Sequence, residues 1–542
     1  MGIPQIWRML GIKLARRMVT PPDGALVDTP PGGGRRWELD ERLLADSPST
    51  FKPGLTEADL VDDRTWSDLE MDKLFRRWDQ SITPPGSQYL YATLRTYQHK
   101  VRSLEANVHT LNQFAHHQET SRPLRLALDG LNCKEAAYLA GFLTGPAPQL
   151  PKYYRLFYLL SVLTIAMTIG LFFHTEFLFP LIGLWLVNIV TNVRFGRTFA
   201  KDAAALTGLV RLLAVAPRVS ASLRAANLPE VARLDELSAA ASRVRAKTRW
   251  AVFRPANAND LVVALFEYLN LLCLFEITFS CWSLVAIRED RPTLASLLEQ
   301  VARLDALQGL AGALASYPVY CRPRLEAGLA YDIAGMYHPL VERAVGNSLA
   351  GTGKSLLISG TNMAGKTTFM KTLAMNCLLA QTVGVCLAQS AVLPRVRVKA
   401  LIKRDDTVAL GQSYFLGEAK ELLEILREAE RADRPFLLAL DEIFRGTNSV
   451  ERIAAGCAVL SHLAESMLVI ASTHDLELCV LLELEFDSCH FTEAVTATGA
   501  RFDYRLRKGP CTSRNAIQLL VLAGYPKPVT DRAEALAHAR PQ

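Results

Sequence analysis

The sequence has no paired cysteines and no concentrated basic surface. Its ten cysteines are scattered, and none forms a Cys-x-x-Cys pair. Neither a zinc site nor a disulfide framework is therefore predicted, and this cysteine usage is typical of a reducing cytosol. A dense basic stripe with interleaved aromatic residues is also missing, although the net charge is +6. That charge permits contact with nucleic acid or anionic lipid but requires neither.

Acidic residues are missing from the first twenty positions, which mix apolar residues with Lys and Arg. The apolar run is too short and too interrupted for a secretory signal, and no small-residue cleavage site follows it. A membrane-surface helix, a targeting peptide and a frayed start are the alternatives, and we favour the membrane-surface helix. The Pro/Gly-rich stretch up to residue 36 is predicted to be a linker.

Charge is also missing from two long runs, 156–173 and 177–193, which only a short turn separates. Each run is about long enough to cross a hydrocarbon core of roughly 30 Å. Lys and Arg flank both outer ends but not the turn, so both flanks are expected in the cytoplasm. The pattern predicts a transmembrane hairpin at 156–193. A hairpin buried in a large core would normally show a polar face, and this one has almost none.

Helical periodicity dominates the rest of residues 37–330. A third apolar stretch, 261–287, carries Glu267, Asn270 and Glu276. A third crossing would place two carboxylates in lipid, at a few kcal/mol each. It would also put the flanking parts on opposite sides of the membrane. A buried or membrane-adjacent helix is favoured, and a third crossing remains the alternative.

From residue 331 the sequence alternates strand and helix patterns, which predicts an α/β domain with a mostly parallel sheet. The predicted strands are 355–359, 391–398, 435–440, 467–472 and 488–492.

The first of these strands leads into a phosphate-binding loop. Residues 360–367 match G-x-x-x-x-G-K-[ST] and lie between the strand and a predicted helix, 369–381. Glycines let backbone N–H groups turn toward phosphates, and the helix N-terminus adds partial positive charge. Lys366 is expected to reach the β- and γ-phosphates of ATP, and Thr367 to ligate Mg²⁺. The predicted ATP-binding residues are Gly360, Thr361, Asn362, Met363, Ala364, Gly365, Lys366, Thr367 and Thr368.

Two later strands end in groups suited to hydrolysis. The apolar strand at 435–440 runs into Asp441, expected to hold Mg²⁺, and Glu442, placed to act as general base toward water. The strand at 467–472 leads to His474, which can hydrogen-bond the γ-phosphate or the water. A lone histidine at the end of a strand is more often structural, but the phosphate-binding loop and the acidic strand in the same domain favour a functional role here. Ser413 lies at a helix start, where it is either an N-cap or a donor to a partner's γ-phosphate.

Together these segments resemble the MutS family of DNA mismatch-repair ATPases. Gly360-Thr-Asn-Met-Ala-Gly-Lys-Thr367 resembles that family's G-P-N-M-G-G-K-S, and Asp441-Glu-Ile-Phe-Arg-Gly-Thr447 resembles its D-E-I-G-R-G-T. Further matches are Ser81-Ile-Thr-Pro-Pro-Gly86, Tyr337-His-Pro-Leu340, Asp405-Asp406 with Gly411-Gln-Ser413, Ser472-Thr-His474, Lys508-Gly-Pro-Cys-Thr-Ser513 and Leu522-Ala-Gly-Tyr-Pro526.

The resemblance implies a helical lever and core domain at 37–330 and an α/β P-loop ATPase domain of ABC/MutS type at 331–542. It also implies a homodimer with composite sites, in which Ser413 acts in trans. Ala364, Thr361 and Phe444 depart from the family's residues without removing a catalytic group. The N-terminal mismatch-reading domain has no counterpart, so the chain resembles a membrane-tethered branch of the family.

We therefore expect a Mg²⁺-dependent ATPase anchored in the inner membrane, with the ATPase domain in the cytoplasm. One hypothesis is a DNA-binding protein of mismatch-repair type. The other is a mechanotransducer that acts on a protein partner without mismatch recognition. A salt titration of duplex DNA binding separates them, because phosphate contacts give a steep salt dependence.

Overall fold

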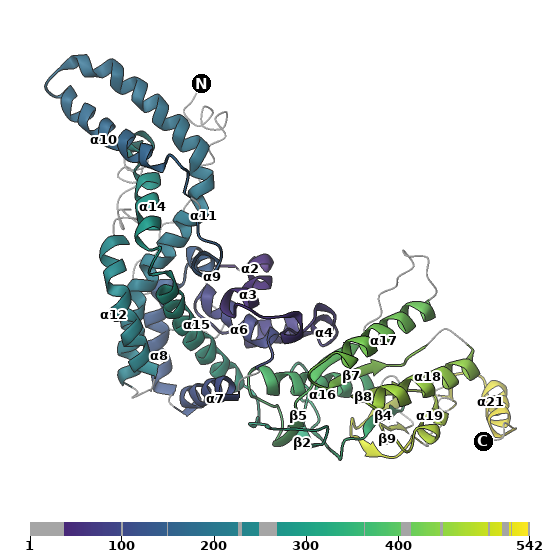
Figure 1. Cartoon of the computed structure of the whole chain (residues 1–542). Coiled ribbons are helices and arrows are strands. Elements are labelled where there is room, and N and C mark those ends of the chain that lie inside the picture. The colour runs from purple at the N-terminus through teal and green to yellow at the C-terminus, as the bar shows by residue number, and fades with distance from the viewer. Residues whose placement is uncertain are drawn as a thin grey trace.

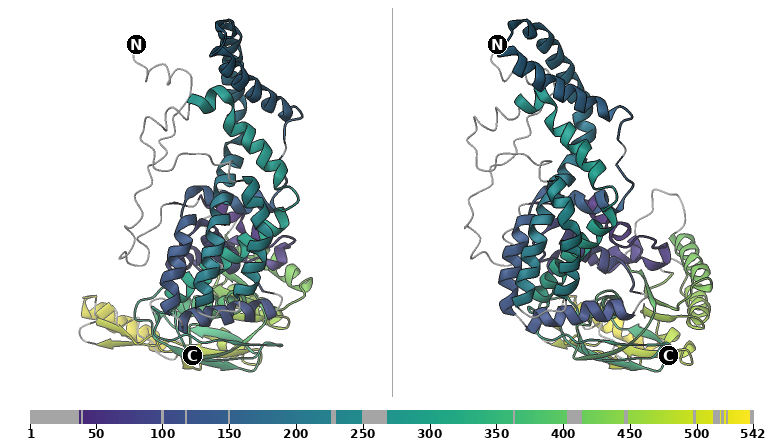
Figure 2. Two further views of the ribbon diagram at one scale, coloured as in Figure 1. Left: turned by 90° about the vertical axis from the view of Figure 1, so that its left-hand side faces the viewer. Right: turned by 60° about the vertical axis from the view of Figure 1, so that its left-hand side comes forward.

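The computed structural model describes residues 37–38, 40–98, 101–116, 118–148, 150–225, 230–248, 268–361, 364–402, 414–444, 448–496, 499–511, 517, 520–521 and 523–539. Over these residues a helical part is followed by an α/β part, as the two periodicities predict (Figure 1). The molecule is elongated, with a helical hairpin at the end far from the α/β part (Figure 2). The interpretations of residues 1–36 lie outside the described residues.

The helical part is organised around one long buried helix, α15, which packs against α6, α7, α9 and α12. Its elements are α2 (Glu41–Ala45), α3 (Ser47–Phe51), η1 (Glu57–Asp59), α4 (Asp63–Asp68), α5 (Met71–Trp78), α6 (Pro84–Arg95), α7 (Val101–His116), α8 (Gln118–Leu128), η2 (Asp129–Leu131), η3 (Lys134–Tyr138), α9 (Leu139–Thr144), α10 (Tyr154–Leu171), η4 (Thr175–Phe177), α11 (Leu178–Ala225), α12 (Glu230–Thr248), α14 (Phe275–Ala286) and α15 (Arg291–Leu314).

A buried carboxylate fastens the start of α6 to α15. Asp305 of α15 accepts hydrogen bonds from Ile82 N (2.9 Å), Thr83 N (2.8 Å) and Thr83 Oγ1 (2.6 Å). A Cβ atom on Gly86 would lie 2.2 Å from Asp305 Oδ2, so only glycine allows this approach. Pro84 suits the first turn of a helix, where a missing N–H group has no effect. The Ser-Ile-Thr-Pro-Pro-Gly segment is thus a docking turn between two core helices.

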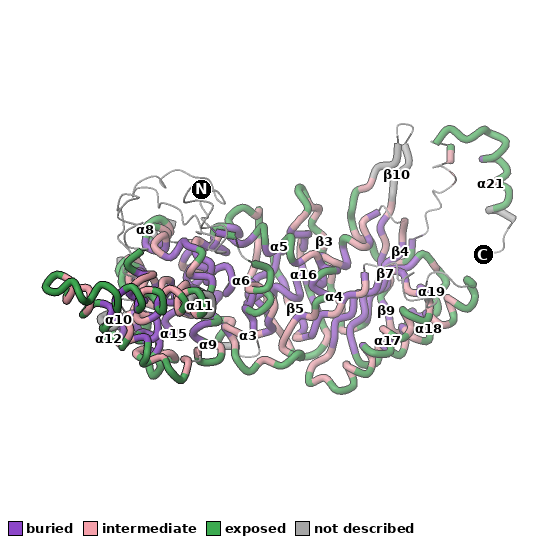
Figure 3. The backbone as a smooth tube through the Cα atoms, turned by 90° about the horizontal axis from the view of Figure 1, so that it is seen from above, coloured by how far each residue is buried: buried purple, intermediate pink, exposed green. Residues whose placement is uncertain are grey.

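The hairpin of α10 and α11 projects away from the core, and most of its surface is exposed (Figure 3). The alternative of a hairpin buried in a large core is therefore wrong. Helix α11 also continues well past the apolar run that ends at residue 193. It is a single helix of 48 residues whose second half is buried in the helical part, at Leu209, Leu212 and Val219. One rod thus joins the hairpin tip to the core.

Helix α14 lies beside both hairpin helices and accounts for most of the described part of the third apolar stretch. It begins after Leu274, which has a left-handed φ of 57°. The backbone carbonyl of Leu272 accepts from Asn188 Nδ2 of α11 at 2.6 Å, and the same amide donates to Thr164 Oγ1 of α10 at 2.8 Å. Polar groups of the hairpin therefore point inward, toward α14.

The α/β part contains two main sheets and the helices that cover them. Its elements are β1 (Arg324–Glu326), β2 (Tyr331–Met336), β3 (Asn347–Gly351), β4 (Ser355–Ser359), α16 (Lys366–Thr382), β5 (Ser390–Pro394), β6 (Arg397–Leu401), α17 (Tyr414–Glu430), β7 (Phe436–Asp441), α18 (Ser449–Ala464), β8 (Leu468–Thr473), α19 (Leu476–Leu481), β9 (Phe486–His490), β10 (Glu493–Thr496), β11 (Gly499–Phe502), β12 (Arg507–Lys508) and α21 (Lys527–Ala539).

The larger sheet has the order β12-β9-β4-β8-β7-β6 and is parallel except at β12, as predicted. The smaller sheet, β1-β5-β2-β3, has mixed pairing and was not expected. The single strand predicted at 391–398 is wrong, since the chain forms β5 and β6 there, in different sheets. Pro394 ends β5, because proline has no N–H group to continue the ladder.

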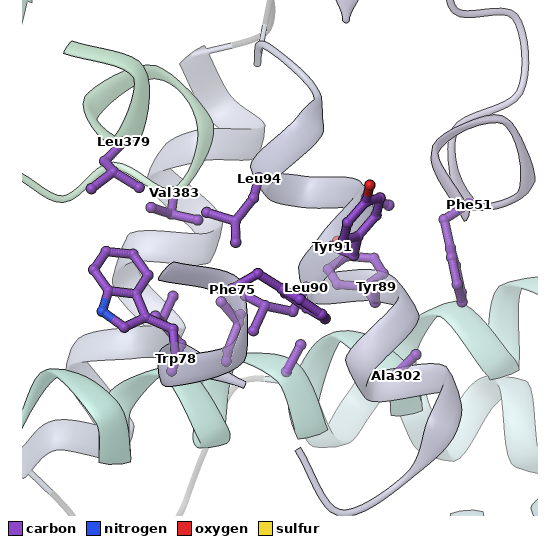
Figure 4. Packing of buried hydrophobic residues seen from close by; sticks show 14 of the residues in the cluster. Phe51, Phe75, Trp78, Tyr89, Leu90, Tyr91, Leu94, Ala302, Leu379 and Val383 are labelled. Carbon is purple, nitrogen blue, oxygen red and sulfur yellow. The ribbon is translucent and has the colours of Figure 1, made fainter. Parts of the chain in front are cut away.

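One hydrophobic core runs through both parts of the chain. At the end of α16, Leu379 and Val383 lie around Leu94 of α6 and Trp78 of α5 (Figure 4). The helix that follows the predicted phosphate-binding loop is thus packed directly on the helical part.

Candidate functional site

The backbone of the predicted phosphate-binding loop needs glycine at two positions. Gly360 has φ 128°, and a Cβ there would lie 2.6 Å from the carbonyl oxygen of Phe491. Gly365 has φ 107° and caps α16. These glycine conformations and the N-terminus of α16 agree with what a phosphate-binding loop would require.

Three of the predicted site residues meet at the edge of the large sheet. Lys366 Nζ donates to Gly360 O (2.5 Å) and lies 3.2 Å from His474 Nε2 and 3.6 Å from Glu442 Oε1. His474 Nε2 and Glu442 Oε1 are 2.7 Å apart. Lys366 and Glu442 are buried, whereas the His474 side chain is 43% exposed. The predicted lysine, base and sensor therefore form one cluster.

Sheet topology explains this convergence. Strands β4, β8 and β7 are adjacent and parallel, so their carboxyl ends lie at the same edge. The phosphate-binding loop follows β4, His474 follows β8, and Asp441 with Glu442 stands at the end of β7. Ligands of parallel α/β sheets bind at this edge.

The predicted Mg²⁺ ligands are also in contact. Thr367 Oγ1 donates to Asp441 Oδ2 at 3.0 Å. Hydroxyl and carboxylate oxygens are the donors that Mg²⁺ prefers, so these residues fit the metal. Ser472 donates to the other carboxylate oxygen of Asp441, which fixes the orientation of that carboxylate. Sequence reasoning missed this role, although Ser472 stands where the family pattern has alanine.

The turn after Asp441 carries backbone strain at two non-glycine residues. Glu442 has φ 52° and Phe444 has φ 59°. The family pattern has glycine at the second position, which matches the left-handed conformation. Phe444 is held there because its ring packs on Phe415 of α17, with centroids 4.9 Å apart, and its N–H group donates to Glu418 Oε2 at 2.8 Å. This link between the acidic strand and α17 was not predicted.

A bidentate ion pair orders the segment next to His474. Arg452 of α18 donates to Asp475 Oδ2 through Nε (2.9 Å) and to Oδ1 through Nη2 (2.7 Å). Such fork-shaped pairs fix geometry as well as charge. Neither residue stood out in the sequence, because the contact joins elements far apart in the chain.

Not every predicted site residue is described. Thr361 accepts from Ala364 N at 3.2 Å, and Thr368 is exposed on the first turn of α16. Asn362, Met363 and Ser413 lie outside the described residues, as do residues 405, 406 and 411. The role of Ser413 in trans stays a prediction.

The histidine of the His-Pro-Leu segment packs near the phosphate-loop helix. His338 is buried, and its Nδ1 accepts from Leu340 N at 3.2 Å. Burial, and after it the charge of Lys371, lowers the pKa of His338 to about 4, while Glu70 acts in the opposite direction. Lys371 Nζ and Glu70 Oε1 form an ion pair of 2.7 Å between α16 and the residue that precedes α5. His338 is therefore neutral at neutral pH.

We expect His338 to destabilise the fold in mild acid. Below pH 6.5 the unfolded chain binds a proton at this site and the folded chain does not, so stability falls until about pH 4. The loss reaches at most about 3 kcal/mol. Replacing His338 by Asn retains a hydrogen-bond acceptor but removes the titration. Thermal unfolding of the full chain from pH 7 to pH 4 should show the wild type losing more stability than His338→Asn, and parallel profiles would contradict this account.

Comparisons with known proteins agree with the geometry. Residues 356–539 match the family model "MutS domain V", which includes every candidate catalytic residue. A DNA mismatch repair protein MutS of Natronomonas pharaonis is 34% identical over 46% of this chain and 30% of its own length. Relatives of the same name in Thermus aquaticus and Sorangium cellulosum are each 34% identical, over 47% and 52% of this chain. The chain spans about a third of the length of these relatives. Residues 356–539 therefore belong to the MutS domain V family.

Proposed function

We propose that this chain is a membrane-anchored ATPase of MutS type that couples Mg·ATP binding and hydrolysis to movement of its helical arm. The observation that carries the proposal is that one chain combines the Lys366, Glu442 and His474 cluster of the α/β part with an apolar hairpin that α11 joins to the helical part.

The hairpin surface supports the membrane anchor. Seven of its apolar side chains are at least 60% exposed: Leu159, Val162, Phe172, Phe173, Phe179, Leu186 and Val190. At about 1.5 kcal/mol each, keeping them in water costs about 10 kcal/mol. That figure is comparable to the whole stability of a typical domain, roughly 5–15 kcal/mol. Lipid removes this cost, and the inward-facing Asn188 and Thr164 suit a protein whose outside is apolar.

Length and composition agree with this reading. In the described residues three helical segments are long and apolar enough to cross a membrane. Two of them, Tyr154–Leu171 and Thr175–Phe195, form the hairpin and have 17% and 11% of their residues buried. The third, Lys201–Arg224, is 56% buried and belongs to the helical core. We therefore assign two crossings, with both flanks and the α/β part in the cytoplasm.

The site residues have separable roles in ATP hydrolysis. Lys366 and the N–H groups of the loop bind phosphate oxygens, while Thr367 and Asp441 would hold Mg²⁺. The metal would supply charge neutralisation at the phosphates. Glu442 accepts the proton of the attacking water. His474, 2.7 Å from Glu442, orients that carboxylate and responds to the state of the γ-phosphate.

Nucleotide state can reach the helical part through direct contacts. Ala400 N and Ile402 N, in and just after β6, donate to Thr65 Oγ1 (3.1 Å) and Asp68 Oδ2 (2.7 Å) of α4. Together with the core shared by α16, α5 and α6, these bonds connect the sheet to the helices that lead to the hairpin. ATP binding is expected to tilt this helical part.

The resemblance and the names of the relatives extend the proposal to DNA and to a homodimer. DNA mismatch-repair-like binding is the first candidate for what the arm acts on. A mechanotransducer acting on a protein partner is the second, and it is favoured by the unbroken course of α11 from core to hairpin. The salt dependence of duplex binding distinguishes them.

Membrane attachment gives the test. We expect the wild type to stay in the membrane pellet after a high-salt and an alkaline wash. The double variant Val162→Arg, Leu186→Arg should leave the pellet, because each arginine at the bilayer centre costs about 3 kcal/mol. Leu484→Arg, at an exposed apolar position in the α/β part, is the control and should remain attached. Release of the wild type by salt, or a double variant that stays attached, would refute the anchor. If protease accessibility placed the two termini on opposite sides of the membrane, the assignment of two crossings would be refuted.

A further inference from the structure

Two reduced cysteines face each other where the helical part joins the α/β part. Cys321 lies between α15 and β1, and Cys386 lies between α16 and β5. They form an isolated antiparallel bridge, in which Cys321 N donates to Cys386 O (2.8 Å) and Cys386 N donates to Cys321 O (3.0 Å). A hydrogen-bonded pair of this kind has Cα atoms about 5.5 Å apart, within the range that a disulfide spans.

The two thiols are chemically unequal. Cys321 is half-buried, whereas Cys386 is buried and its S–H group donates to Asn376 Oδ1 of α16 at 3.4 Å. When Cys321 ionises, the S–H group of Cys386 can turn from Asn376 to the Cys321 sulfur. This hydrogen bond lowers the pKa of Cys321, and together with burial it raises the pKa of Cys386. Cys321 is thus the more accessible of the two sulfurs and the more easily ionised, the combination that favours reactivity in a cysteine.

We propose that Cys321 and Cys386 are a redox-active pair that closes to a disulfide when the protein meets a peroxide. The Cys321 thiolate attacks one peroxide oxygen and breaks the O–O bond, giving a sulfenic acid. The Cys386 sulfur then attacks the Cys321 sulfur, forming the S–S bond as the sulfenic oxygen leaves with protons as water. Overall two thiols and hydrogen peroxide give one disulfide and two waters.

The location gives the bond a mechanical consequence. Tyr317 of the same linker donates to Pro339 O at 2.9 Å and accepts from Trp78 Nε1 of α5 at 3.0 Å, so the linker lies between the two parts. Leu387 N donates to Asn376 Oδ1 of α16 at 2.7 Å. A bond from Cys321 to Cys386 therefore ties the end of α15 to the segment that follows the phosphate-loop helix.

Non-reducing peptide mapping of the full-length protein tests the proposal. The concentration of hydrogen peroxide is raised until dimedone, which labels sulfenic acids, reacts at Cys457. Cys457 is the other half-buried cysteine and serves as the internal control. We expect a linked peptide containing Cys321 and Cys386, about 2 Da lighter than the two thiol peptides together, which dithiothreitol reverses. In Cys386→Ser, dimedone should label Cys321 instead. The proposal would be overturned if dimedone labelled Cys321 in the wild type, or if no linked peptide formed at the peroxide concentration that labels Cys457. The mapping of the wild type tests the proposal even if the variant does not fold.

Discussion

Glu442→Gln is expected to bind ATP normally and to hydrolyse it about 10²–10⁴ times more slowly, the range that a positioned general base contributes. Glutamine has the size of glutamate and still offers an oxygen to His474, which lies 2.7 Å from the carboxylate. It cannot accept the proton of the attacking water. Binding and chemistry should therefore separate in this variant.

Single-turnover hydrolysis and equilibrium nucleotide binding, measured on the same preparation with Mg²⁺, check this prediction. Glu477→Gln is the matched control, since this substitution makes the same chemical change at the exposed start of α19. It should hydrolyse ATP at the wild-type rate. If Glu442→Gln also turned over at that rate, another group would have to be the base.

Lys366→Ala is expected to weaken ATP binding at least about 100-fold, or about 3 kcal/mol. The ammonium group is the one buried cation of this cluster in the described residues, and it is held by Gly360 O next to Glu442 and His474. Removing it takes away the charge-assisted bonds to phosphate, which are stronger than neutral ones.

Lys354→Ala serves as the control for this variant. Lys354 precedes β4 at the opposite end of the strand and contacts only Glu483 O among its described hydrogen-bond partners. Its removal should leave the ATP dissociation constant unchanged. Thermal unfolding of Lys366→Ala without nucleotide reports whether loss of the cation beside Glu442 has unfolded the site. A folded Lys366→Ala protein with wild-type affinity would contradict the assigned role.

Local patterns were enough to select the candidate residues of the site. The glycine spacing, the strand before it and the two acidic residues after a second strand predicted that Thr367 and Asp441 share one metal ion, and the two side chains are in contact. They did not predict that β8 lies between β4 and β7, which brings His474 to Lys366 and Glu442. Strand order depends on packing between distant segments, and a single sequence does not record it.

Two other features were not predicted from the sequence, each for a specific physical reason. The charges after residue 193 suggested the end of a membrane segment, and they do mark a change from exposed to buried surroundings. They do not end the helix, because Lys and Arg are good helix formers. The left-handed backbone of Phe444 was not predicted, because its strain is offset by a ring contact with α17. No local sequence pattern indicates that contact.

The length of α11 sets the scale of any motion of the proposed membrane anchor. Its 48 residues span about 70 Å, so a tilt of about 10° at the core would sweep the tip through about 12 Å. That distance is over a third of the roughly 30 Å hydrocarbon thickness. A bilayer resists such sideways displacement, and by reciprocity the resistance would be felt at the nucleotide site. In this arrangement the stiffness and thickness of the membrane would themselves act as effectors of ATP turnover.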